Sequence, residues 1–239
     1  MKSKIYNLIV LDESGSMSCV RNQTLSGCNE TINTIRSAQE KYADTQEHFI
    51  SIYAFQSNEK KPSHYLVKNE PIGRVAAVNA ELYVPWGCTP LYDAIGATLT
   101  DLKAEVKDKD LAIGNVTIIT DGMENSSTHY TCEHVVQMID ALKEVGWSFN
   151  FIGANIDVKG TATALHIDNS LEFQQDEKGA QEMFARERNS RMEWLGRTHR
   201  VLEETQPLYG AESVKVRAGL FNRLKEAAAD YFSSRNDKK

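Results

Sequence analysis

The sequence has no hydrophobic run long enough to cross a membrane. A membrane-spanning helix needs ~20 consecutive apolar residues, whereas the first apolar run of this chain ends at Asp12. The residues before Asp12 are also too few for the apolar core and cleavage site of a secretory signal peptide. These absences predict a cytoplasmic protein that does not bind membranes.

The sequence also has no Cys-x-x-Cys pair among its four cysteines. In a chain without a signal peptide, scattered cysteines are expected to be reduced. His129, Cys132 and His134 lie close together, but their spacing matches no zinc-binding pattern and no fourth ligand is apparent. We therefore expect neither a disulfide framework nor a zinc site.

The composition is that of an ordinary globular protein. The 239 residues are 41% hydrophobic and 25% charged, which excludes a disordered, collagen-like or disulfide-stapled chain. The formal charge of −6 argues against a surface that attracts nucleic acid globally. The length suits one large domain with an extension. We place the domain core at residues 1–175 and C-terminal helices at residues 176–239.

Four short apolar segments have the pattern of strands that are buried on both faces. They lie at residues 5–11, 48–55, 115–120 and 147–152. The helix-length stretches between them lie at residues 23–44, 90–107 and 132–145. This alternation predicts an α/β fold with a doubly wound, Rossmann-like, mostly parallel sheet. Residues 64–68 and 81–84 are weaker strand candidates, one of which could be an antiparallel edge.

The later part of the chain is predicted to be more helical. Helices are expected at residues 157–166 and 176–192, around a short strand at 170–173, and at about 211–232. The last helix has one apolar stripe, which we expect to dock on the core. The stripe consists of Val214, Ala218, Phe221, Leu224, Ala228 and Tyr231. Residues 233–239 are polar and are predicted to be a frayed tail.

Five oxygen-bearing side chains lie where the predicted strands end or a helix begins. Asp12, Ser14 and Ser16 follow the first strand at alternate positions. Asp121 follows a later strand, and Thr89 opens a helix. Ligands of open α/β sheets bind outside the carboxyl ends of the strands, so these donors are expected to converge. Hydroxyls and carboxylates without thiolates or imidazoles suit a hard divalent cation such as Mg²⁺.

Each donor also has a simpler interpretation. Thr89 and Pro90 have the pattern of a helix N-cap followed by the first helical residue. Ser14, Ser16 and Asp121 could each belong to a turn. The joint placement of the five residues, more than any one of them, favours a metal site.

Three segments resemble the metal-ion-dependent adhesion site of von Willebrand factor A (VWA) domains. They are Asp12-Glu13-Ser14-Gly15-Ser16, Thr89 within Gly-Cys-Thr-Pro-Leu, and Thr120-Asp121-Gly122. The resemblance is to the bacterial intracellular type and covers roughly residues 4–175. It departs from that type at Cys88, where bacterial relatives often have a second glycine.

The resemblance implies a protein-binding function and no catalytic residues. In the family, Ser14, Ser16 and Thr89 would bind the metal directly, while Asp12 and Asp121 would act partly through water. A largely neutral set of direct ligands leaves the cation electrophilic. An Asp or Glu of a partner protein could then complete the coordination octahedron. The implied cofactor is Mg²⁺, with Mn²⁺ or Ca²⁺ as alternatives.

A metal-dependent phosphohydrolase is one alternative. Asp12 at the end of the first strand and the later Asp121 superficially suit phosphoryl chemistry. However, Ser14 stands where haloacid dehalogenase-type enzymes have a second aspartate, and no basic residue is near the donor segments. The sequence also has neither a Gly-x-Ser-x-Gly motif nor a glycine-rich nucleotide-binding motif.

An anion-binding or nucleic-acid-binding surface is the other alternative. Residues 186–200 contain five arginines but only two acids, Glu187 and Glu193. The arginines are Arg186, Arg188, Arg191, Arg197 and Arg200. Arginine binds phosphates and carboxylates bidentately, but a solvated helical face is the more common explanation of such a stretch.

Overall fold

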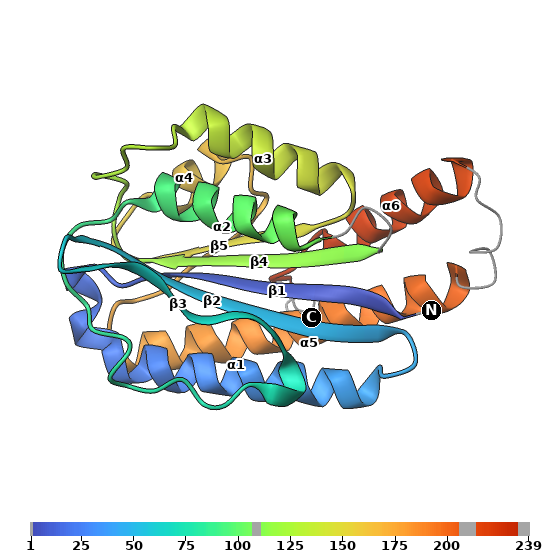
Figure 1. The fold of residues 1–239 in the computed structure, drawn as a ribbon, viewed down its shortest axis with the longest axis horizontal. Coiled ribbons are helices and arrows are strands. Elements are labelled where there is room, and N and C mark those ends of the chain that lie inside the picture. Colours follow the sequence, from blue (N-terminus) through green and yellow to red (C-terminus); the bar gives the residue numbers. More distant parts are fainter. Residues whose placement is uncertain (1, 107–110, 206–213, 234–239) are drawn as a thin grey trace.

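A six-stranded sheet forms the centre of the molecule (Figure 1). The computed structural model describes residues 2–106, 111–205 and 214–233. The strand order is β3-β2-β1-β4-β5-β6, and every neighbouring pair is parallel except β2 and β3. The strands are β1 (Ser3–Asp12), β2 (Gln46–Asn58), β3 (Lys61–Pro71), β4 (Ala112–Thr120), β5 (Ser148–Gly153) and β6 (Asn169–Glu172). The predicted α/β fold with a doubly wound, mostly parallel sheet is confirmed.

Helices cover both faces of this sheet, which explains why the central strands read as continuous apolar runs. In Figure 1, α1 and α5 lie below the sheet, and α2, α3 and α4 lie above it. The sixth helix, α6, packs against α5 and extends past the sheet. The helices are α1 (Arg21–Lys41), α2 (Leu91–Glu105), α3 (Cys132–Glu144), α4 (Val158–Ala164), α5 (Glu177–Thr205) and α6 (Val214–Ala228), with short 3₁₀ helices η1 (Gly15–Val20) and η2 (Ile72–Arg74). No helix in the described ranges is both long and apolar enough to cross a membrane.

Two of the weaker predictions have different outcomes. The candidate strand at 64–68 lies within β3, which is the antiparallel edge of the sheet. The candidate strand at 81–84 is wrong, because this segment pairs with no strand and includes a turn. In this segment Tyr83 is buried, whereas Glu81, Leu82 and Val84 are exposed.

The C-terminal helices also differ from their predicted limits. The helix predicted at 176–192 continues to Thr205 as α5, because buried side chains recur at helical spacing up to that residue. In α6, Leu224 is buried as expected, but Ala218 is exposed and Leu220 is buried in its place. Residues 211–213 of the predicted last helix and 234–239 of the predicted tail lie outside the described residues.

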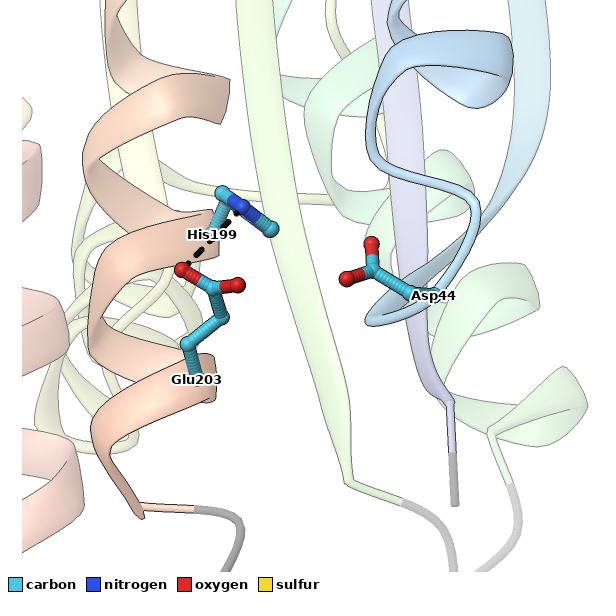
Figure 2. A group of neighbouring side chains, drawn as sticks. All are labelled: Asp44, His199 and Glu203. Carbon is cyan, nitrogen blue, oxygen red and sulfur yellow. Dashed lines mark ion pairs between the residues drawn. The ribbon is translucent and has the colours of Figure 1, made fainter.

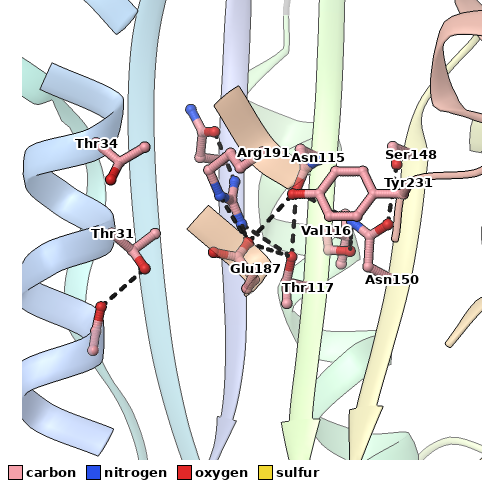
Figure 3. Close-up of polar contacts among 12 residues, drawn as sticks. Thr31, Thr34, Asn115, Val116, Thr117, Ser148, Asn150, Glu187, Arg191 and Tyr231 are labelled. Carbon is pink, nitrogen blue, oxygen red and sulfur yellow. Dashed lines mark hydrogen bonds and ion pairs between the residues drawn. The ribbon is translucent and has the colours of Figure 1, made fainter. Parts of the chain in front are cut away.

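A buried ion pair fastens α5 to the middle of the sheet (Figure 3). Arg191 is fully buried and donates from Nε to the Glu187 carboxylate at 2.9 Å. It also donates to Asn7 Oδ1 of β1 at 2.9 Å and to Thr117 Oγ1 of β4 at 3.0 Å. Tyr231 follows α6, and its hydroxyl donates to the Glu187 carboxylate at 3.3 Å. These contacts connect α5 to β1, β4 and the end of the chain.

The interpretation of residues 186–200 as a solvated helical face is therefore wrong for Arg191. Other arginines of this stretch also bind groups of the chain itself. Arg188 pairs with Glu30 at 2.6 Å, while Arg186 and Arg197 donate to backbone carbonyls near the C-terminus. The stretch is thus no free basic patch, and these contacts do not favour a phosphate-binding surface.

Substitution of the buried arginine tests this account of α5. Removal of one partner from a buried ion pair leaves an uncompensated charge and costs about 3–5 kcal/mol. We expect Arg191→Ala to lower the free energy of unfolding, measured in urea, by about that amount. The matched control is Arg188→Ala on the same helix, whose partner Glu30 is half exposed and whose loss should cost about 1 kcal/mol or less. Equal losses in the two variants would contradict the account.

Candidate metal centre

The predicted metal site lies where the winding of the sheet changes direction. From β1 the chain winds to β2 on one side, and it later returns to place β4 on the other side. Leu11 is paired with Ile119, which brings Asp12 level with Thr120 and therefore next to Asp121. The loops that follow β1 and β4 thus meet at the carboxyl edge of the sheet, where open α/β sheets bind their ligands.

Asp12 is fully buried and both of its carboxylate oxygens accept hydrogen bonds. Oδ1 accepts from the backbone N–H of Ser14 at 2.6 Å, and Oδ2 accepts from the hydroxyl of Thr120 at 2.6 Å. Gly122 N donates to the same Thr120 hydroxyl at 3.1 Å. The carboxylate is therefore held in one orientation by the two loops that meet at this edge.

Ser14, Ser16 and Asp121 form a continuous chain of contacts. Ser14 Oγ lies 3.1 Å from Ser16 Oγ, and the Ser16 hydroxyl donates to Asp121 Oδ1 at 2.7 Å. Gln175, which follows β6, donates from Nε2 to Asp121 Oδ2 and to the Ser16 carbonyl. Ser14 and Asp121 are buried, whereas Ser16 is exposed, so the cluster opens to solvent at Ser16.

Thr89 reaches the same cluster through Gly122. A Cβ atom on Gly122 would lie 2.7 Å from Thr89 Oγ1, so only glycine allows this approach. Asn125 accepts from Thr89 N at 2.9 Å and donates its own N–H to Thr89 O at 3.2 Å. The predicted N-cap role of Thr89 is wrong, because Pro90 is the N-cap of α2 and the helix begins at Leu91. The structure thus brings Asp12, Ser14, Ser16 and Asp121 into one hydrogen-bonded cluster and places Thr89 against Gly122, the residue that follows Asp121.

The cluster carries buried negative charge. Burial raises the pKa of Asp12 to about 6, although the hydrogen bonds from Thr120 and Ser14 oppose the rise. Burial also raises the pKa of Asp121, against the hydrogen bond from Ser16. In the described chain, no ion pair with lysine, arginine or histidine involves either aspartate. Buried carboxylates are costly without a partner, and this set of oxygen donors fits a hard divalent cation.

The sequence analysis missed three residues that support this cluster. Thr120 orients Asp12, and its place in the Thr-Asp-Gly segment was a usable signal. Gln175, which follows β6, contacts Asp121, and nothing local in the sequence indicates that contact. Glu13 is fully buried next to Asp12 in the chain, and its carboxylate pairs with Lys61 at 2.8 Å, which holds the segment that follows β1.

A second group of candidate ligands lies far from this edge (Figure 2). Asp44, His199 and Glu203 place their potential ligand atoms within 4.8 Å of one another. His199 already has a partner at each ring nitrogen, with Thr45 Oγ1 2.7 Å from Nδ1 and Glu203 Oε2 3.3 Å from Nε2. Both carboxylates are exposed, so the solvated ion pair accounts for the group. Substitutions at Asp44 or Glu203 can therefore serve as controls in experiments on the proposed metal site.

The raised pKa of Asp12 predicts how stability depends on pH without metal. Between pH 3.8 and about 6 the folded state holds a proton that the unfolded state releases, so stability falls as pH rises. Asp12→Asn cannot ionise and should be more stable than wild type at pH 7 in EDTA by about 1–3 kcal/mol. This advantage should vanish at the acid end of the range. Urea unfolding at several pH values measures the difference.

Asp44→Asn is the control for this experiment, because Asp44 is exposed. This variant keeps Asp12 and should therefore show the wild-type fall in stability between pH 3.8 and about 6. An Asp12→Asn variant that is less stable than wild type at pH 7 would show that the carboxylate is compensated within the chain.

Comparison with known proteins supports the fold assignment. No family model matches this sequence, and no curated protein matches it. Similar solved structures include the pilus adhesin SpaC from Lactobacillus rhamnosus GG, with a TM-score of 0.60 and 13% identity over 81% of this chain and 31% of that one. A von Willebrand factor type A protein from Catenulispora acidiphila gives a TM-score of 0.56 and 16% identity over 80% of this chain and 43% of that one.

The VWA domain of SpRpn10 matches with a TM-score of 0.52 and 10% identity, over 78% of this chain and 95% of that domain. The chain thus spans less than half the length of the first two structures but nearly all of the SpRpn10 domain. At such low identities the similarity shows the fold alone. The chain has the fold of a VWA domain.

Proposed function

We propose that Asp12, Ser14, Ser16, Thr89 and Asp121 bind a divalent cation, and that this centre binds a carboxylate of a partner protein. The observation that carries the proposal is the convergence of three hydroxyls and two buried carboxylates at one sheet edge, where no basic side chain of the described residues forms an ion pair with the acids. Mg²⁺ is the cation that suits these donors best, with Mn²⁺ and Ca²⁺ as alternatives.

The hydrogen bonds of the aspartates support a division of roles. Both oxygens of Asp12 accept hydrogen bonds, from Ser14 N and Thr120, so Asp12 balances charge while it holds the loop. Asp121 is likewise engaged by Ser16 and Gln175. The hydroxyls are then the natural direct ligands. A bound Mg²⁺ with mostly neutral ligands would offer a coordination position to an oxygen anion.

Binding fits the cluster better than catalysis does. Ser14 occupies the position where a phosphohydrolase of the dehalogenase type needs its acid–base aspartate. In the part of the chain that the structure describes, no basic side chain is hydrogen bonded to the five donors, so none is placed to hold a phosphoryl group. The cytoplasmic location and the division of the chain at residue 175 stay predictions from the sequence.

A thermal unfolding series tests the metal site. A ligand at about a hundredfold excess over its Kd stabilises by ~2.7 kcal/mol, which for a chain of this size raises the midpoint by roughly 5–10 °C. We expect this rise with Mg²⁺ in wild type and in Thr89→Ser, which keeps the hydroxyl. Thr89→Val and Ser14→Ala should lose it. Glu203→Gln, in the distant ion pair, is the control that should retain it.

The same shift in Thr89→Val as in wild type would contradict the assignment of the site. A shift that Glu203→Gln abolishes would instead place the metal at the Asp44–His199–Glu203 group.

A pull-down from host lysate tests the role of the site in protein binding. The arms are wild type with Mg²⁺, wild type with EDTA, and Thr89→Val with Mg²⁺. A partner that is captured through a metal-bound carboxylate should be present in the first arm alone. Equal capture in all three arms would show that recognition takes place elsewhere on the surface.

A further inference from the structure

Large apolar side chains are exposed on the two loops that carry Thr89 and Asp121. All the large apolar residues that the described chain leaves exposed lie on these loops. They are Leu82, Val84, Trp86 and Met123, with exposed fractions of 45%, 44%, 65% and 68%. We call these four residues the apolar rim. Exposed apolar side chains that gather in one place mark interaction surfaces.

Hydrogen bonds to the backbone of Asp12 and Glu13 hold the part of the rim that precedes Thr89. Along residues 82–86 the exposed side chains alternate with Tyr83 and Pro85, which are buried. The Tyr83 hydroxyl donates to the carbonyl of Asp12 at 2.7 Å, and Trp86 N donates to the carbonyl of Glu13 at 2.8 Å. The backbone that bears the exposed side chains is thereby fixed relative to the end of β1.

Glu13 provides the second anchor. Its buried carboxylate accepts from Val84 N, from Lys61 Nζ at 2.8 Å and from Gln56 Nε2 at 2.8 Å. Lys61 also donates to the carbonyl of Leu82 at 2.8 Å. A surface held in one conformation loses less conformational entropy when a partner binds. The segment is therefore organised for binding before a partner arrives.

Met123 is joined to the same surface through Thr89. It lies between Gly122, which approaches Thr89 Oγ1 too closely for any side chain, and Asn125, which exchanges two hydrogen bonds with the Thr89 backbone. Trp86 precedes Thr89 by three residues. One part of the rim thus lies just before Thr89 in the chain, and the other lies on the segment that is hydrogen bonded to the Thr89 backbone.

We propose that the apolar rim and the metal centre form one docking surface, whose occupant is a protein segment with an Asp or Glu next to large apolar side chains. The inference rests on the proposed function and specifies the partner. The centre attracts an anion, whereas the rim residues carry no charge and attract apolar groups. One segment that combines both chemistries satisfies both parts of the surface. Tryptophan is among the residues that contribute most to protein interfaces, and Trp86 is largely exposed.

A display library of short random peptides tests the proposal. The full chain is panned in Mg²⁺ and in EDTA, and the recovered peptides are sequenced. Three proteins are compared: wild type, Trp86→Ser/Met123→Ser, and Thr89→Val. Urea unfolding and the Mg²⁺-dependent thermal shift confirm that the double variant is folded and keeps its metal site. Sedimentation velocity over a range of concentrations shows whether the rim binds a second copy of the chain.

For wild type in Mg²⁺, we expect peptides with an Asp or Glu beside Trp, Phe, Leu or Met. The double variant should still select acidic peptides but lose the apolar preference, and it should bind a peptide selected by wild type about tenfold or more weakly. Thr89→Val should lose all metal-dependent selection.

Acidic peptides without apolar neighbours, or equal affinity in the double variant, would overturn the inference and leave the proposed function intact. No Mg²⁺-dependent selection at all would overturn both. Self-association of wild type that Trp86→Ser/Met123→Ser abolishes would also overturn the inference, because the occupant would then be a second copy.

Discussion

Two buried carboxylates without a basic partner are the constraint on which the site depends. Asp12 and Asp121 meet because β1 and β4 are neighbours in the sheet although a hundred residues of chain separate them. Hydrogen bonds from Ser14 N, Thr120 and Ser16 orient the carboxylates, yet burial still raises the pKa of both. Such uncompensated acids are characteristic of functional sites, and the divalent cation that we propose would offset the penalty of their burial.

Two other buried acids, Glu13 and Glu187, are paired with basic side chains. Glu13, the immediate neighbour of Asp12, is fully buried but is compensated by Lys61, and it holds the segment that bears Trp86. On the α5 side of the sheet, Arg191 and Glu187 compensate each other and fasten that helix. Among the described residues, these two buried charges are paired where they stabilise the fold, whereas Asp12 and Asp121 have no ion pair. Adjacent residues 12 and 13 thus link the proposed metal centre to the segment that carries Leu82, Val84 and Trp86.

Much of the fold, and the positions of the five donors, could be predicted from the sequence. The continuous apolar strands required helices on both faces, and that arrangement brings strand ends together. Residues 81–84 were misjudged because side chains of Glu13 and Lys61 satisfy their backbone groups, a role normally filled by a partner strand. The prediction ended α5 at residue 192, but its packed face continues beyond that residue through Trp194, Leu195, Val201 and Leu202. Gln175 reaches Asp121 through the tertiary structure alone, so no local pattern could reveal it.

The most direct test of the central claim is anomalous diffraction from crystals of the protein grown with Mn²⁺, which replaces Mg²⁺ at oxygen sites and scatters anomalously. The account predicts an anomalous peak within coordination distance of Ser14 Oγ, Ser16 Oγ and Thr89 Oγ1. A peak at Asp44, His199 and Glu203 with none at the sheet edge, or no peak at saturating Mn²⁺, would contradict it.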